Sequence, residues 1–163
     1  MRAKDALTYI DLIKTKTMKL FNLIFAIVLS VLFVGCSKDK DSYQNYPRPD
    51  WVVATPEAYP NSFTAIVSLP NNINTYSEDT DMLAAFIGDE CRGFGNLVKS
   101  EDGTKRVYYI TIRASDTENR NIVFRYYSSR LSYLYQAKTQ VAFEIDGTYG
   151  TYDSPVILDI EQI

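Results

Sequence analysis

The segment Met82-Leu83-Ala84-Ala85-Phe86-Ile87-Gly88-Asp89-Glu90-Cys91-Arg92-Gly93 carries the strongest structural pattern in this chain. Successive residues of a strand point to opposite faces, which divides the apolar residues into two sets: Leu83, Ala85 and Ile87 on one face, Ala84 and Phe86 on the other. Because both faces are apolar, the stretch predicts a strand that is buried on both sides and lies inside a sheet. Gly88-Asp89 then supplies a turn.

Further segments on both sides of this stretch alternate apolar and polar residues and are separated by turn residues. They are Ser62 to Leu69, Cys91 to Val98, Val107 to Arg113, Asn121 to Tyr127, Leu131 to Gln136, Val141 to Ile145 and Pro155 to Asp159. We expect Tyr108, Ile110 and Ile112 to face inward on one strand, and Val141, Phe143 and Ile145 on another. About eight short strands predict an all-β fold, an antiparallel β-sandwich of the immunoglobulin-like or jelly-roll-like type, as one domain over residues 51–163.

The turn after the central strand carries residues with expected structural roles. Gly88 and Asp89 form the turn, and Arg92 follows two acids. A guanidinium beside carboxylates favours a structural ion pair or a clamp on loop carbonyls, with a ligand-facing role as the alternative. Gly93, close to a second glycine, predicts a bulge or a close backbone approach.

The N-terminal region is typical of an export signal. Leu20 to Gly35 is an apolar run of sixteen residues that follows Lys19 and ends in a Gly-Cys pair. A transmembrane helix is the alternative, but it needs about 20 apolar residues. The stretch Leu32 to Cys36 resembles the bacterial lipobox, which implies a signal peptide over residues 1–35 and diacylation of Cys36. The lipid on Cys36 would then be the contact with the membrane. Met18 is the alternative translation start.

The segment after Cys36 is expected to be a flexible tether over residues 36–50. Ser37 to Asp41 is charged, and Tyr46-Pro47-Arg48-Pro49 can form neither a helix nor a central strand. The acids close behind the cysteine resemble the surface-export signal of Bacteroidetes lipoproteins. That resemblance implies an outer-membrane lipoprotein displayed at the cell surface, and the periplasmic face is the alternative.

Charge and composition exclude several classes of function. Residues 1–35 hold five of the 17 basic residues and two of the 20 acids, which leaves a net charge of −6 on the remaining chain. An acidic surface argues against a nucleic-acid partner. The chain has no histidine, which removes the commonest general base and the usual metal ligands, so we expect no enzyme, no cofactor and no metal. Cys91, without a partner cysteine, is expected to be a small buried apolar residue.

One acidic loop leaves the question of calcium open. Glu78, Asp79 and Asp81 lie close together and carry the oxygen ligands that calcium prefers, but the loop lacks the glycine and final glutamate of an EF-hand. A solvated loop is the expected alternative.

Tyrosines are the strongest signal for binding, because their rigid rings suit stacking on sugars or capping partner side chains. The chain has 13 of them. The candidate ligand-binding residues are Tyr127, Tyr133, Tyr135, Tyr149 and Tyr152. We expect at least two of the last four to be exposed on one surface. The alternative for each ring is ordinary packing.

The Ala-Ala-Phe strand, its turn and the Arg92-Gly93 pair together resemble a recurring β-sandwich module of Bacteroidetes cell-surface and secreted proteins, across most of residues 51–160. The resemblance implies an extracellular module without an assigned catalytic role. We therefore expect a lipid-anchored, non-enzymatic surface module that binds a glycan or a protein. The alternative is a structural or adhesive accessory subunit of a surface assembly with no small ligand.

Overall fold

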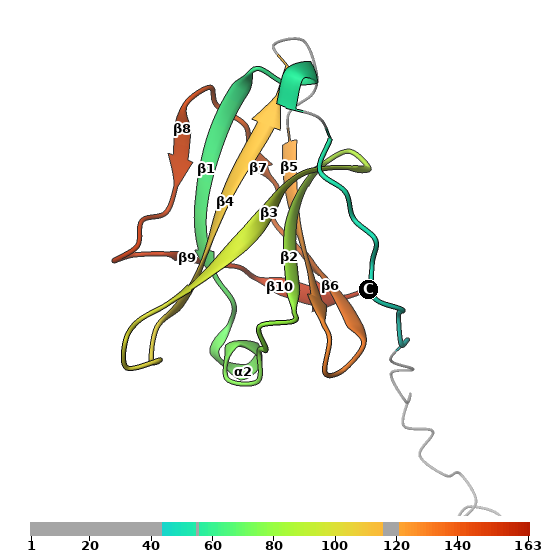
Figure 1. Cartoon of the computed structure of the whole chain (residues 1–163), viewed down its shortest axis with the longest axis vertical. Helices are drawn as coiled ribbons and strands as arrows, with labels where there is room; N and C mark the ends of the chain where they lie inside the picture. The colour runs from blue at the N-terminus through green and yellow to red at the C-terminus, as the bar shows by residue number, and fades with distance from the viewer. Residues whose placement is uncertain (1–43, 55, 116–120) are drawn as a thin grey trace, which may run out of the picture. The chain divides into compact units, whose positions relative to one another are not determined.

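The computed structural model describes residues 44–54, 56–115 and 121–163. Its central element is β2 (Met82–Ile87), which lies between β5 (Asn121–Ser128) and β3 (Glu90–Lys99) (Figure 1). The five residues Leu83 to Ile87 are all buried. The prediction of a strand buried on both faces is therefore confirmed.

Ten strands form one mixed sheet in the order β10-β6-β5-β2-β3-β4-β1-β8, with β7 paired to β5 and β9 paired to β1. The remaining strands are β1 (Asn61–Ser68), β4 (Arg106–Ala114), β6 (Tyr133–Ala137), β7 (Val141–Ala142), β8 (Gly147–Tyr149), β9 (Val156–Ile157) and β10 (Ile160–Gln162). The sheet is mixed because β1 pairs in parallel with β8 and β9, whereas the other pairings are antiparallel.

The sheet curls at β3, which changes partner along its length. Glu90 to Phe94 pair with β2, and Gly95 to Lys99 pair with β4. The all-β prediction is confirmed. The finer prediction of an antiparallel two-sheet sandwich with about eight strands stays a prediction, because the strands form one continuous curled sheet.

The inside of the curl holds the main core. Tyr108, Ile110 and Ile112 of β4 are buried there, as their alternation predicts, together with Phe124 and Tyr126 of β5. The opposite face of β2 is covered by a smaller cluster of Ala84, Phe86 and Cys91, against which Trp51 and Val53 pack. The Trp51 ring meets the Phe86 ring edge-on, at 5.2 Å between centroids.

The C-terminal third departs from the predicted strands. The segment predicted as Val141 to Ile145 is a strand only over Val141–Ala142, and Ile145 is 51% exposed, so its predicted inward orientation is wrong. Phe143 does turn inward. The chain leaves the sheet after Ala142 and turns at Asp146, whose φ is +56°. The predicted strand Pro155 to Asp159 is shorter, and β10 follows it.

Two short helical turns complete the fold: η1 (Pro56–Ala58), of the 3-10 type, and α2 (Asn71–Asn74). α2 follows Pro70 in the connection between β1 and β2. It crosses one end of the curled sheet (Figure 1).

Residues 44–50, predicted as part of the tether, lie against the domain. The Tyr46 amide donates to the Ser132 carbonyl at 2.7 Å, and the Arg48 guanidinium donates to the Thr80 carbonyl at 3.2 Å. The prolines that prevent regular structure here do not prevent such contacts. The predicted signal peptide, Cys36 and the tether up to residue 43 lie outside the described residues, as does the alternative start at Met18.

Candidate functional site

An aromatic hollow of about 510 Å³ opens at the end of the core that α2 crosses. Its walls come from α2 and the loop after it, the end of β5, the β5–β6 turn, β6 and β10. The lining residues are Asn72, Ile73, Tyr76, Ser128, Leu131, Tyr133, Tyr135, Ile160 and Gln162. We call this set the aromatic hollow.

Strand register explains why two of the predicted tyrosines meet here. Tyr133 and Tyr135 of β6 lie opposite Ser128 and Tyr126 of β5, and alternate residues share a face, so both rings turn toward the inside of the curl. Their centroids are 6.5 Å apart at an interplanar angle of 62°. The Tyr135 ring also lies 5.8 Å from the buried Tyr126 ring, which fixes its position. Both rings remain partly exposed.

Tyr76 is a further candidate for ligand binding, which no pattern in the sequence predicts. It follows α2 in a loop without strand alternation, so no periodic signal marks it. Its ring is 59% exposed at the rim of the hollow, and the Arg130 guanidinium lies 5.6 Å from its centroid. A cation at this distance attracts the ring and helps to orient it.

The other predicted tyrosines lie elsewhere. Tyr127 is only 4% exposed and donates its hydroxyl to the Tyr46 carbonyl at 3.4 Å, so its predicted role in ligand binding is corrected to packing. Its side chain points away from the inside of the curl, because it follows the inward-facing Tyr126 on the same strand and lies opposite Leu134. Tyr149 lies on β8, which is the last strand of the sheet on the side away from β6 and β10, and its ring stacks on the Phe124 ring. Tyr152 lies outside the strands, and the Lys105 ammonium is 4.2 Å from the centroid of its ring.

Asp81 holds the loop that borders the aromatic hollow. Its carboxylate accepts hydrogen bonds from the buried Tyr126 hydroxyl, from the Ser129 amide at 2.8 Å, from the Ser129 hydroxyl at 2.7 Å and from the Glu78 amide at 2.8 Å. Both oxygens therefore already have protein donors. The loop between α2 and β2 is thereby tied to the end of β5.

The same contacts bear on the calcium site considered for the acidic loop, because a calcium ion would need the carboxylate oxygens of Asp79 and Asp81 as ligands. Asp81 is saturated by protein donors, and Asp79 forms an ion pair with Lys99, which lowers the Asp79 pKa through that hydrogen bond. In the described ranges 44–54, 56–115 and 121–163, no group of three or more Asp, Glu, Cys or His side chains is placed to hold a metal ion.

The residues of the β2–β3 turn support the strand pair. Gly88 has φ +60°, which favours glycine, and Asp89 is exposed beside it. The register shifts between Ala85 and Phe86, so that Arg92 is the extra residue of a bulge. A Cβ on Gly93 would lie 2.3 Å from the Thr111 carbonyl oxygen, which no side chain tolerates.

The bulge directs Arg92 into the fold. Its side chain is 3% exposed, pairs with Glu90 at 3.0 Å and donates to the Arg113 carbonyl at 3.2 Å. It also lies 3.4 Å from the centroid of the Tyr59 ring, and Tyr59 donates to the same Glu90 carboxylate at 2.9 Å. This arrangement joins the segment before β1 to β3 and β4.

Cys91 lies beside this bulge, in the smaller core cluster. Burial raises the pKa of its thiol, which keeps the group protonated and unreactive at neutral pH. Its packing fits the predicted role of a small apolar residue.

Within the described part of the chain, no helix is both long and apolar enough to cross a membrane. Known proteins provide no further guide to the site: no protein-family model matches the chain, and neither a curated protein nor a solved structure does.

Proposed function

We propose that the chain is a lipid-anchored, non-enzymatic module of the bacterial outer-membrane surface that binds a glycan in the aromatic hollow. The observation that carries the proposal is the grouping of three partly exposed tyrosine rings, Tyr76, Tyr133 and Tyr135, around one open hollow. Its volume lies within the range of small-ligand sites, about 300–1,000 Å³.

The chemistry of the walls favours a sugar over a charged ligand. Tyrosine rings stack on the C–H faces of sugars, and their hydroxyls bond to sugar hydroxyls. Asn72 and Gln162 add amides, and the Gln162 Nε2 has no hydrogen-bond partner among the described residues. No carboxylate, cysteine or lysine is among the nine described residues that line the hollow, so its walls offer hydrogen bonding and stacking rather than acid–base chemistry.

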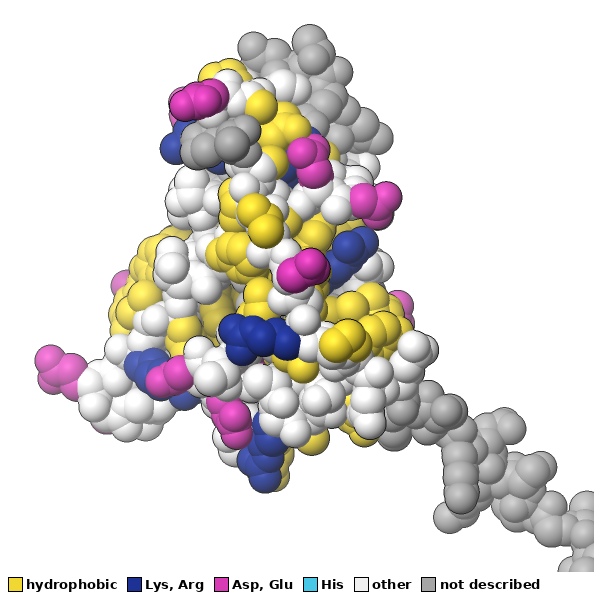
Figure 2. Space-filling model, turned by 45° about the vertical axis from the view of Figure 1, so that its right-hand side comes forward, with side chains coloured by type: hydrophobic (Ala, Val, Ile, Leu, Met, Phe, Trp, Pro, Cys, Tyr) yellow, Lys and Arg dark blue, Asp and Glu magenta, His cyan; other side chains and the backbone are white. Residues whose placement is uncertain are grey.

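The surface charge supports an uncharged partner as well. Figure 2 shows one face on which acidic and basic side chains are scattered among hydrophobic and uncharged ones, without an extended area of either sign. Such a face lacks the basic stripe of a nucleic-acid-binding protein. The lipid on Cys36, which the lipobox-like stretch predicts, would supply the attachment to the membrane.

The finer fold description belongs to the same proposal. A sandwich module of the kind found in Bacteroidetes surface proteins would have two layers, and the passage of β3 from β2 to β4 supports two layers that share one strand.

The test is retention on immobilised polysaccharides and glycan arrays. We expect wild-type protein to bind and the variants Tyr133→Ala and Tyr76→Ala to bind about five- to 150-fold more weakly, since stacking of a nucleic-acid base on one aromatic ring contributes about 1–3 kcal/mol. Tyr152→Ala is the matched control, because it removes a partly exposed tyrosine outside the hollow. Equal binding by all four proteins, or no binding by the wild type, would refute the glycan function.

A second candidate is the accessory subunit of a surface assembly, or a module with a protein ligand. It is favoured by β8 and β10, which end the strand order and leave edges to which another chain can add a strand. In that case Thr148→Pro, which interrupts the edge strand β8 outside the aromatic hollow, should abolish co-purification with surface proteins and leave glycan retention unchanged.

A further inference from the structure

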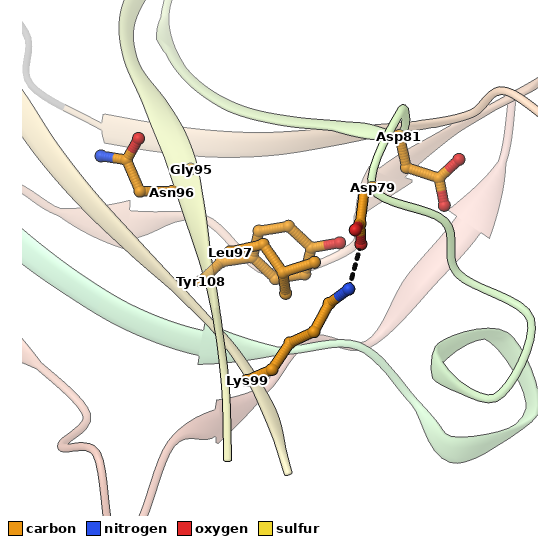
Figure 3. A pocket seen from close by; sticks show the side chains of 7 residues that line it. All are labelled: Asp79, Asp81, Gly95, Asn96, Leu97, Lys99 and Tyr108. Carbon is orange, nitrogen blue, oxygen red and sulfur yellow. Dashed lines mark hydrogen bonds and ion pairs between the residues drawn. The ribbon is translucent and has the colours of Figure 1, made fainter. Parts of the chain in front are cut away.

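A second, polar hollow of about 560 Å³ is bordered by the loop that Asp81 holds (Figure 3). Its lining residues are Asp79, Asp81, Gly95, Asn96, Leu97, Lys99 and Tyr108. They come from the loop before β2, from the second half of β3 and from β4. We call this set the polar hollow.

Tyr108 is the unusual member of the polar hollow. Its side chain is 2% exposed, yet its hydroxyl has no hydrogen-bond partner among the described residues. Burial, with a contribution from the nearby Asp81 carboxylate, raises the pKa of Tyr108 to about 12, so the hydroxyl remains a donor at neutral pH. Buried polar groups nearly always have partners, and an exception indicates a role outside folding or a missing molecule.

The ion pair that lies next to this hydroxyl is weak. In Figure 3 the hydroxyl end of Tyr108 points toward Asp79 and Lys99, which form an ion pair with each other. The two side chains are 72% and 38% exposed, and pairs of such exposure stabilise little. A ligand that offers its own hydrogen bonds can therefore displace the pair and reach the tyrosine.

Charge balance in the polar hollow selects an uncharged ligand. The carboxylates of Asp79 and Asp81 are matched by the cations of Lys99 and of Arg106, which lies 3.6 Å from Asp79. Leu97 adds an apolar wall on the face that it shares with Tyr108, whereas the Asn96 amide points away from that face (Figure 3). Donors, acceptors and an apolar surface without net charge match a sugar ring, which carries hydroxyls at its edge and C–H groups on its faces.

We propose that the polar hollow is a second sugar subsite, in which the Tyr108 hydroxyl donates to a hydroxyl oxygen of an uncharged sugar. The inference rests on the proposed glycan function and adds the ligand class. Asp81 lines the polar hollow and bonds to Ser129 beside the aromatic hollow, so the two subsites flank one loop. The expected ligand is a neutral glycan of more than one sugar.

The experiment is an NMR titration of the ¹⁵N-labelled domain with glucose, galactose, mannose and N-acetylglucosamine, each alone, and with glucuronate and glucosamine as charged probes. We expect at least one neutral sugar to shift the amide signals of Gly95 to Lys99, and neither charged probe to bind more tightly than that sugar. Tyr108→Phe should weaken this binding about three- to tenfold, as the loss of one hydrogen bond predicts. Asn96→Ala is the control and should leave this binding unchanged, because the Asn96 side chain points away from the hollow (Figure 3).

Stability separates a ligand role from a structural one. Tyr108→Phe should fold with a melting temperature equal to or above that of the wild type, because it removes an unpartnered buried hydroxyl. A clear fall in melting temperature with unchanged sugar binding would overturn the inference.

The positions of the shifted signals distinguish this inference from the proposed function. Shifts confined to residues 131–135 would overturn the second subsite and keep the aromatic one. Shifts confined to residues 95–99 would keep the second subsite and refute the aromatic one. Absence of shifts at both places with every neutral sugar would overturn both, and tighter binding of a charged probe would overturn the choice of an uncharged ligand.

Discussion

Replacement of Asp81 by alanine should strongly destabilise the domain, although Asp81 lies in a loop. Its carboxylate receives the Tyr126 hydroxyl, both donors of Ser129 and the Glu78 amide. Asp81→Ala removes all four acceptor contacts at once. The Tyr126 side chain is fully buried, so its hydroxyl cannot turn to water.

The magnitude follows from these partners. A buried hydroxyl left without an acceptor costs about 1–3 kcal/mol, and a hydrogen bond to a charged group contributes about 1.5–3 kcal/mol. The loop donors are partly exposed and regain water, so we expect a total loss of about 2–4 kcal/mol. That is a large part of a typical stability of roughly 5–15 kcal/mol, and it corresponds to a fall in melting temperature of about 8 °C or more.

Urea unfolding followed by circular dichroism measures the effect. The control is Asp79→Ala, which removes a largely exposed carboxylate from the same loop and should change the unfolding midpoint little. A double-mutant cycle of Asp81→Ala with Tyr126→Phe should give a coupling energy of about 1–3 kcal/mol, because the second change removes the orphaned hydroxyl. A coupling energy near zero, or equal midpoints for Asp81→Ala and Asp79→Ala, would show that the carboxylate does not hold the loop.

Three other perturbations test separate parts of the structure. Ala85→Asp should prevent folding, because it places an unpaired carboxylate in a strand buried on both faces; an unchanged melting temperature would contradict this. Cys36→Ser should move the protein from the membrane fraction to the soluble fraction, and persistence in washed membranes would disprove the lipid anchor. Stability should fall between about pH 10 and 12, because unfolded tyrosine ionises near pH 10 and Tyr108 near 12; the loss due to Tyr108 is at most about 2.7 kcal/mol, and a Tyr108→Phe variant with the same alkaline profile would rule that contribution out.

The strands that carry strong alternation could be predicted from the sequence, and the shorter ones could not. β2 and β4 have long apolar patterns whose burial depends only on strand geometry, so their faces are as predicted. The segment after Ala142 has the same kind of pattern, but Asp146 adopts a positive φ and donates its amide to the Ser62 carbonyl, which takes the chain out of the strand. A tertiary contact of this kind leaves no mark on local alternation.

The candidate site was predictable only where strand register decides the geometry. Tyr133 and Tyr135 alternate on one strand and therefore share a face. Tyr76 joins them from a loop more than fifty residues earlier, and no local pattern connects the two segments. Tyr127 resembles the other tyrosines in sequence, but it lies on the opposite face of its strand, where Tyr46 meets its hydroxyl. The shift of Arg92 into the fold likewise depends on a bulge whose register the sequence does not specify.

Two buried tyrosines distinguish groups that stabilise the fold from groups available to a ligand. Tyr126 and Tyr108 are equally inaccessible, but the Tyr126 hydroxyl donates to Asp81, whereas the Tyr108 hydroxyl has no partner among the described residues. Folding accounts for the first hydroxyl and not for the second, since phenylalanine would fill the same space without a polar atom in the core. The same change, tyrosine to phenylalanine, should therefore lower stability at Tyr126 and leave it equal or higher at Tyr108. If both changes lowered stability alike, the Tyr108 hydroxyl would have a structural partner, such as a bound water, and the polar hollow would lose its strongest support as a sugar subsite.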